Sequence, residues 1–173
     1  MGPVVKYCGS GNIQRSYDCS TLFPNGVVAS CGTISADYGV DCLLPTGSTC
    51  RYQGATGPFV AFCAGTGAAC QLDLGGADGG SSALCVTGQG TCTAATPDAG
   101  FTPVCAGGDA LTLDCNQNQP YQYKCPGAGA CTAGVCKGPT GAFCLNDPTV
   151  PFKCNTGLTC RGDADGGIGT CAP

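Results

Sequence analysis

Cysteine is the residue type with the most chemistry to offer in this chain, because 18 of the 173 residues are cysteine and none is histidine. A cysteine thiolate can bind a metal ion, act as a nucleophile or join a second thiol in a disulfide. No C-x-C or C-x-x-C pair occurs, and the shortest interval runs from Cys131 to Cys136. The even count, the wide spacing and a cysteine density of about 10 % favour disulfides over zinc sites.

We therefore predict that every cysteine is oxidised, in at most nine bridges whose pairing the sequence leaves open. Fourteen of the cysteines fall into two interleaved ladders with steps of 19 to 23 residues, which is a period of about 21 residues. The predicted bridge cysteines are Cys8, Cys19, Cys31, Cys42, Cys50, Cys63, Cys70, Cys85, Cys92, Cys105, Cys115, Cys125, Cys131, Cys136, Cys144, Cys154, Cys160 and Cys171.

The cysteine period also predicts how the chain is organised. A fixed period is typical of a tandem array of small units that stabilise one another. We expect one elongated body over residues 1–173, built from repeats of about 21 residues. The register breaks near the C-terminus, so residues 137–173 are predicted to form an atypical cap.

Short motifs around the cysteines indicate the elements that must position them. Glycine-containing tracts such as PTGSTC (45–50) predict turns, and an apolar or aromatic residue two places before a cysteine, as in YKC (123–125), predicts a short strand. With 30 glycines, 12 prolines and no glutamate, long helices are not expected. The predicted fold class is a small disulfide-rich repeat protein of short β-strands, hairpins and loops with little helix. A disulfide-stapled β-solenoid is the alternative.

The ordinary hydrophobic core is expected to be thin. Leucine, isoleucine, valine and phenylalanine together make up about a sixth of the chain, below the roughly 20 % under which a highly charged sequence is classed as disordered. Closing a loop of ~15 residues with a disulfide stabilises a fold by ~3 kcal/mol in the chain-entropy model. Bridges can therefore offset the deficit, and we expect reduction to unfold the protein.

Charge and composition exclude several classes of function. The net charge is −4 and only 10 % of residues are charged, without a basic cluster, so we expect no nucleic-acid partner. The sequence contains no run of ~18 apolar residues, so we expect no membrane span. Without histidine there is no Ser-His-Asp or Cys-His arrangement, and oxidised thiols are not nucleophiles. We predict that the chain is not an enzyme.

Two acidic residues near the C-terminus offer a weak cation motif. Asp163 and Asp165 lie in GDADGG (162–167), where closely spaced carboxylates on a glycine-permitted turn can converge on Ca²⁺. The rest of an EF-hand loop is missing, and an ordinary Asp-Gly turn is the favoured interpretation. Calcium is the one cofactor that the sequence suggests. Residues 161–163 also spell the adhesion tripeptide RGD, which is a short and common match.

Aromatic residues form two candidate contact surfaces. Tyr121 and Tyr123 alternate, so both rings are expected on one face of a strand, where they can stack on a sugar, pair with a protein or pack over a disulfide. Tyr52, Phe59 and Phe62 form a second apolar group that can cover the repeat stack or make an intersubunit contact.

The phrases CGSGNIQRSYDC (8–19) and CAGGDALTLDC (105–115), followed by glycine-, alanine- and threonine-rich tracts, carry a family resemblance. Over most of its length the chain resembles the cysteine-rich repeat regions of cell-surface proteins of social and predatory delta-proteobacteria. The resemblance implies an extracellular, disulfide-rich and surface-associated protein, and it transfers no catalytic residue.

Two functional hypotheses follow from the sequence. Oxidised cysteines indicate a secreted or cell-surface location. The first hypothesis is an extracellular structural protein that self-associates into a filament, coat or matrix, because head-to-tail contacts between repeat arrays build open fibres. The alternative is a monomeric binding module, such as an adhesin, lectin or protease inhibitor, with a glycan or cell-surface partner.

Overall fold

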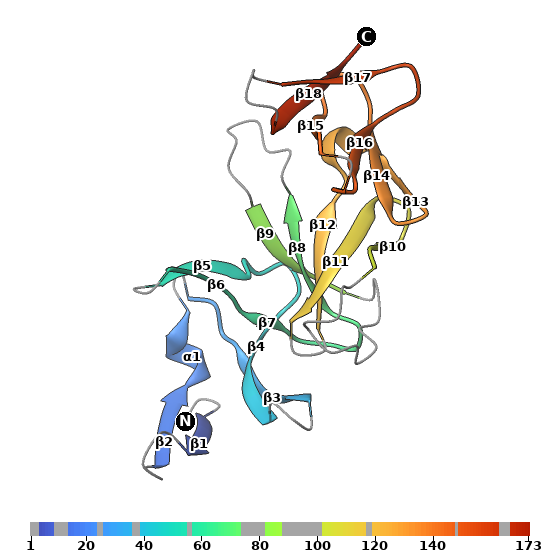
Figure 1. Cartoon of the computed structure of the whole chain (residues 1–173). Coiled ribbons are helices and arrows are strands. Elements are labelled where there is room, and N and C mark those ends of the chain that lie inside the picture. Colours follow the sequence, from blue (N-terminus) through green and yellow to red (C-terminus); the bar gives the residue numbers. More distant parts are fainter. Residues whose placement is uncertain are drawn as a thin grey trace.

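The computed structural model describes residues 4–8, 14–23, 26–35, 39–54, 57–73, 82–87, 102–116, 119–147, 149–162 and 167–173. They form 18 strands of two to seven residues, one four-residue helix and one short 3-10 helix (Figure 1). The prediction of a disulfide-rich protein of short strands with little helix is confirmed. Within the described residues, no helix is long and apolar enough to span a bilayer.

The chain begins with a hairpin and a short helix. Strands β1 (Val4–Cys8) and β2 (Gln14–Asp18) pair antiparallel. Helix α1 (Cys19–Leu22) follows directly, because the Asp18 carboxylate accepts a hydrogen bond of 2.9 Å from the backbone N–H of Ser20 and so caps the first turn. The cap places the Cys19 side chain in the core.

Two further hairpins follow. Strands β3 (Ser30–Ser35) and β4 (Gly39–Leu44) pair antiparallel, and β7 (Phe62–Cys63) adds to β4 in parallel. Strands β5 (Arg51–Gly54) and β6 (Gly57–Val60) form a separate two-stranded hairpin, which we call the β5–β6 arm. An isolated two-stranded hairpin is marginal in water, so the arm depends on contacts with its surroundings.

The largest sheet has five strands in the order β10-β11-β12-β8-β9. Its bounds are β8 (Ala69–Asp73), β9 (Ser82–Val86), β10 (Val104–Ala106), β11 (Ala110–Asn116) and β12 (Gln119–Lys124). All neighbours are antiparallel except β12 and β8, which run parallel. This sheet lies in the middle of the molecule (Figure 1).

The chain leaves β12 through the 3-10 helix η1 (Pro126–Ala128) and enters a three-stranded sheet. Strands β13 (Ala130–Thr132) and β14 (Val135–Gly138) form an antiparallel hairpin, and β16 (Phe152–Cys154) pairs with β14 in parallel.

The last sheet contains β15 (Phe143–Leu145), β17 (Thr159–Gly162) and β18 (Ile168–Ala172). Strand β18 lies in the centre and pairs antiparallel with both neighbours. The two chain ends lie at opposite ends of the molecule (Figure 1).

Parallel strand pairs join the successive parts of the molecule. The three pairs are β4 with β7, β8 with β12, and β14 with β16. Each of these pairs joins a hairpin to a strand that lies later in the chain, and the β8–β12 pair also carries an ion pair of 3.4 Å between Lys124 and Asp73. Consecutive parts are therefore hydrogen-bonded to one another directly.

Disulfides repeat one arrangement along the chain. In the hairpins β8–β9, β13–β14 and β17–β18, two cysteines face each other across the strands, and both bond to earlier cysteines rather than to each other. The bridges join Cys19 to Cys42, Cys50 to Cys70, Cys63 to Cys85, Cys105 to Cys131, Cys125 to Cys136, Cys144 to Cys160, and Cys154 to Cys171. Cys115 is also disulfide-bonded.

The prediction that every cysteine is oxidised is wrong at Cys31, which is an exposed free thiol. Cys31 faces Cys42 across the β3–β4 hairpin, but its Sγ lies 3.9 Å from the backbone carbonyl of Val4 and not against another sulfur. The side chains of Cys8 and Cys92 lie outside the described residues.

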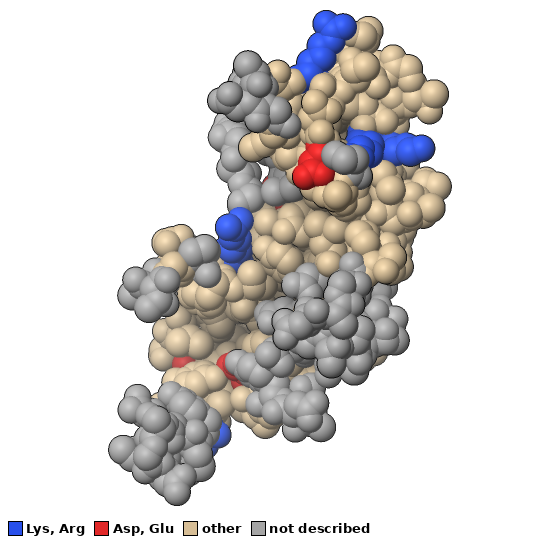
Figure 2. All heavy atoms as spheres, viewed as in Figure 1, with Lys and Arg blue, Asp and Glu red and all other residues tan. Residues whose placement is uncertain are grey.

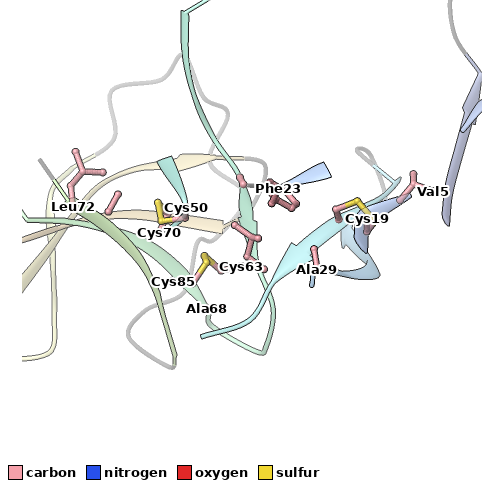
Figure 3. Close-up of a cluster of buried hydrophobic side chains, with 14 residues drawn as sticks. Val5, Cys19, Phe23, Ala29, Cys50, Cys63, Ala68, Cys70, Leu72 and Cys85 are labelled. Carbon is pink, nitrogen blue, oxygen red and sulfur yellow. A yellow bond between two sulfur atoms is a disulfide. The ribbon is translucent and has the colours of Figure 1, made fainter. Parts of the chain in front are cut away.

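Cystines make up much of the core. Of the 14 buried residues in the largest cluster, six are cysteines, and the remainder are small or aliphatic apart from Phe23 (Figure 3). Two smaller clusters, around Leu111 with Phe152 and around Cys144 with Cys171, continue the core toward the C-terminus. Sulfur therefore supplies the buried volume that a larger set of aliphatic residues provides in ordinary domains.

Candidate functional site: the aromatic surface of the β5–β6 arm

The β5–β6 arm carries an aromatic stack that is partly open to solvent. Tyr52 and Phe59 face each other in the hairpin register, so their rings stack with centroids 5.5 Å apart and planes at 26°. Phe23, from the segment after α1, packs on Tyr52 at 5.2 Å. The Tyr52 hydroxyl donates to the backbone carbonyl of Thr49 at 2.5 Å. Phe59 remains 47 % exposed, which leaves one large apolar surface on the arm.

A hollow of about 400 Å³ lies between this arm and β9. Backbone hydrogen bonds such as Cys50 N–H to Ala83 carbonyl (3.0 Å) hold the start of the arm against β9, and the two strands diverge beyond that point. Leu84 is 45 % exposed beside the hollow. The lining residues are Thr49, Arg51, Tyr52, Gln53, Ser82, Ala83 and Leu84.

The electrostatics of the hollow are mild. Partial burial raises the pKa of the Tyr52 hydroxyl, so the phenol remains neutral at physiological pH. Arg51 is the one charged residue of the lining, and the remaining polar groups are hydroxyls and an amide. The hollow can therefore accept a polar or weakly acidic group by hydrogen bonding, but it places no nucleophile beside a general base.

Phe62 does not belong to this surface. It is only 7 % exposed, in the short strand β7 that pairs with β4. Of the two roles expected for the group Tyr52, Phe59 and Phe62, an intersubunit contact does not fit Phe62, because alternation along 59–62 and the parallel pairing with β4 turn its ring into the core. Burial of Phe62 is compatible with the other role, which is to cover the stacked units.

Tyr121 and Tyr123 contact each other, and Tyr123 also contacts the C-terminal part of the molecule. Their rings meet edge to face at 5.5 Å and 80°, and Tyr123 meets Phe152 at 5.7 Å. Burial raises the pKa of Tyr121, the neighbouring Tyr123 raises it further, and Arg51 partly opposes the shift. Tyr123 therefore joins β12 to β16, whereas Tyr121 packs on the largest buried cluster, and contact with a sugar or a partner protein stays a prediction.

A second hollow, also of about 400 Å³, lies in the C-terminal part of the molecule. Lys153 contributes its side chain there, and its Nζ donates to the backbone carbonyl of Asp147. Two half-buried cystine sulfurs lie in the wall. The lining residues are Leu145, Asn146, Lys153, Cys154, Leu158 and Cys160.

Charged groups do not gather at either hollow. Figure 2 shows isolated lysines, arginines and aspartates on a mostly uncharged face. The proposed calcium ligands Asp163 and Asp165 lie outside the described residues. Among the described residues, the groups of three or more potential metal ligands consist of cysteine sulfurs alone.

Sequence reasoning identified Tyr52 and Phe59 but missed three neighbours, Phe23, Arg51 and Leu84. Arg51 directly precedes Tyr52 in strand β5 and could have been found from the sequence. Phe23 and Leu84 lie in other parts of the chain, and the bridges Cys19–Cys42, Cys50–Cys70 and Cys63–Cys85 bring these parts together. Their proximity depends on the disulfide pairing, which the sequence does not reveal, so no local signal could have found them.

No protein-family model, no curated protein and no solved structure matches this chain.

Proposed function

We propose that this chain is an extracellular, non-enzymatic structural protein whose disulfide-stapled units form a stiff body and whose copies associate with one another. The observation that carries the proposal is the combination of buried cystines with direct strand pairing between successive parts. Stable cystines indicate an oxidising compartment. A body in which neighbouring parts share β-sheets resists bending and proteolysis, because few backbone segments can open independently.

The lack of catalytic groups at the two hollows supports a non-enzymatic role. The described lining residues include one arginine and one lysine but no carboxylate. General acid–base chemistry requires a proton donor or acceptor with a suitable pKa within hydrogen-bonding reach of a substrate. The chain contains no histidine that could take this part.

The arm is the surface we propose for self-association. Phe59 and Leu84 are 47 % and 45 % exposed on the arm and on neighbouring β9, and a second apolar surface that covers them would gain ~25 cal/mol for each Å² removed from water. Strand β18 is not available for this purpose, because β15 and β17 cover both of its edges.

Light scattering on the oxidised protein, together with negative-stain microscopy, tests the proposal. Filaments or regular oligomers are expected, and Phe59→Ser should release monomers with an unchanged number of disulfides. Ile168→Ser is the matched control, because Ile168 is 66 % exposed but lies at the C-terminal end of the molecule. A wild-type protein that stays monomeric at high concentration would refute self-association.

A binding module is the second candidate, and the hollow beside the arm is the observation that favours it. Its lining combines the Arg51 guanidinium, the Gln53 amide and the Ser82 hydroxyl with the Tyr52 ring. A binding module would remain monomeric and would lose its ligand in Arg51→Ala and Gln53→Ala. A glycan array and a panel of proteases, probed with wild type and both variants, separates this function from the structural one.

A further inference from the structure

Cysteine sulfurs gather in three separate clusters. In each cluster, three Sγ atoms lie within 4.8 Å of one another. The clusters are Cys50 with Cys63 and Cys85, Cys125 with Cys131 and Cys136, and Cys144 with Cys154 and Cys160.

Each cluster is formed by two neighbouring disulfides. The first contains three of the four sulfurs of the bridges Cys50–Cys70 and Cys63–Cys85, and its three sulfurs are all buried. The other two clusters are formed in the same way by the bridges Cys105–Cys131 with Cys125–Cys136 and Cys144–Cys160 with Cys154–Cys171. The fold therefore brings three cysteine sulfurs together in the same way three times, and in each case a fourth sulfur is bonded to one of the three.

The spacing within a cluster suits a tetrahedral metal ion. A zinc–thiolate bond of ~2.3 Å places the sulfurs of a tetrahedral site about 3.8 Å apart, and the cluster sulfurs already lie within 4.8 Å. All the donors are sulfur, which selects thiophilic ions such as Zn²⁺ and Cd²⁺ over Ca²⁺ or Mg²⁺. The fourth sulfur, which is bonded to one of the three, has to move closer to the other two to complete the site.

We propose that the reduced chain binds one Zn²⁺ or Cd²⁺ ion at each of these pairs of opened bridges, with four cysteine thiolates as ligands. A dithiol or phosphine reductant supplies two electrons for each S–S bond that breaks, and two protons complete the two thiols. The ion then displaces the four thiol protons and forms four metal–sulfur bonds. The metal therefore occupies the place of two disulfides.

The metal form would restore the same fold. Among the four cysteines of the first pair of bridges, Cys50 precedes β5, Cys63 lies in β7, Cys70 in β8 and Cys85 in β9. One ion that binds all four holds the same four segments together as the two bridges do. Because the ordinary core is small, metal binding and folding of the reduced chain should be coupled, as in small zinc domains. This property gives the chain a folded state under reducing conditions, and it does not depend on the proposed structural role.

Anaerobic titration of the reduced full-length chain with Cd²⁺ tests the inference. Thiolate-to-cadmium absorbance in the ultraviolet counts bound ions, and near-ultraviolet circular dichroism of the tyrosines reports tertiary structure. Absorbance and dichroism are expected to rise together, and the oxidised protein should show no such absorbance. Zn²⁺ added to a second sample should restore the dichroism as Cd²⁺ does.

Two double variants give the test its specificity. Cys63→Ser with Cys85→Ser removes two ligands of the first cluster, so it should bind one ion fewer than wild type. Cys19→Ser with Cys42→Ser also removes one bridge, but neither cysteine belongs to a cluster among the described residues, so its stoichiometry should equal that of wild type. Equal stoichiometry in the two variants would overturn the inference, and so would metal absorbance without recovery of tertiary structure, which marks binding by an unfolded chain.

Discussion

The stabilising effect of the disulfides can be tested with two bridges that differ in loop length but not in burial. Cys63 and Cys85 are each 1 % exposed and lie 22 residues apart, whereas Cys125 and Cys136 are 2 % and 0 % exposed and lie 11 residues apart. Each bridge also has one neighbouring bridge against it. In the chain-entropy model, closing the 22-residue loop stabilises the fold by ~3.4 kcal/mol and closing the 11-residue loop by ~2.8 kcal/mol. The bridge with the longer loop is therefore expected to contribute ~0.6 kcal/mol more to the free energy of unfolding.

Urea unfolding of the two double-alanine variants, followed by near-ultraviolet circular dichroism without reductant, measures this difference. Loss of either bridge should lower the free energy of unfolding by about 3–5 kcal/mol once the lost buried volume is added, a large part of a typical ~5–15 kcal/mol. Cys31→Ala removes an exposed free thiol and should change it by less than ~0.5 kcal/mol. The reasoning fails if a bridge variant unfolds at the same urea concentration as Cys31→Ala. It also fails if the shorter loop proves the more costly to lose.

Three further outcomes are expected. The folded, oxidised protein should react with iodoacetamide at Cys31, and peptide mass spectrometry should locate the adduct there. In thermal unfolding, Gly129→Ala should destabilise the fold by about 1–3 kcal/mol, because the added Cβ would lie 2.3 Å from the backbone oxygen of Lys137. Gly108→Ala is the control: its Cβ meets no atom within 4 Å, so the change should be neutral or slightly stabilising. Hydrogen bonds from Thr149 hold the pKa of Asp147 below its ordinary value. The ionised Asp147 carboxylate therefore stabilises the fold above pH ~4, and this stabilisation is lost as the pH falls through the pKa of the folded state. Thr149→Ala should raise the pKa of Asp147 in an NMR titration.

Much of the local structure could be predicted from the sequence, because short motifs have local causes. The aromatic-x-Cys phrase at 123–125 ends strand β12, and the one at 152–154 is strand β16. A side chain two residues before a cysteine shares its face of the strand, so the aromatic ring and the sulfur enter the core together. The four-residue helix at Cys19–Leu22 was not predicted, because the composition of the whole chain argues against helices. Asp18 is a good N-cap, but a single N-cap favours only the turn that follows it.

The disulfide pairing could not be predicted, because it depends on which hairpins form. The bridges Cys19–Cys42 and Cys63–Cys85 join consecutive members of the ladder that starts at Cys19, and Cys50–Cys70 joins consecutive members of the ladder that starts at Cys8. In this half of the chain the period of about 21 residues therefore reflects the span of a bridge. In the second half of the chain, Cys105 bonds to Cys131 and not to the next cysteine of its ladder. In three hairpins, two cysteines face each other but do not bond to each other, and the spacing of cysteines along the sequence does not show this.

The candidate surface was predicted in part, and the missing part has a physical reason. Tyr52 and Phe59 meet because they face each other in one hairpin, which is a short-range relation. The burial of Phe62 is a long-range effect, since its strand pairs with β4, about 20 residues earlier in the chain. The local sequence therefore does not distinguish an exposed aromatic residue such as Phe59 from a buried one such as Phe62.

Strand pairing at the C-terminal end bears on how copies could associate. In two hairpins the strand that carries the last cysteine, β4 or β14, pairs in parallel with a strand from later in the chain. In the last hairpin, β17–β18, the strand with the last cysteine is β18, and it pairs on that edge with the earlier strand β15 in antiparallel orientation. The other strand of this hairpin, β17, lies at the edge of the sheet and carries Arg161. A charged residue on an edge strand opposes pairing with another chain. Extension by repetition of the internal junction is therefore disfavoured at this end, and association is expected at the side of the body, where the β5–β6 arm exposes Phe59.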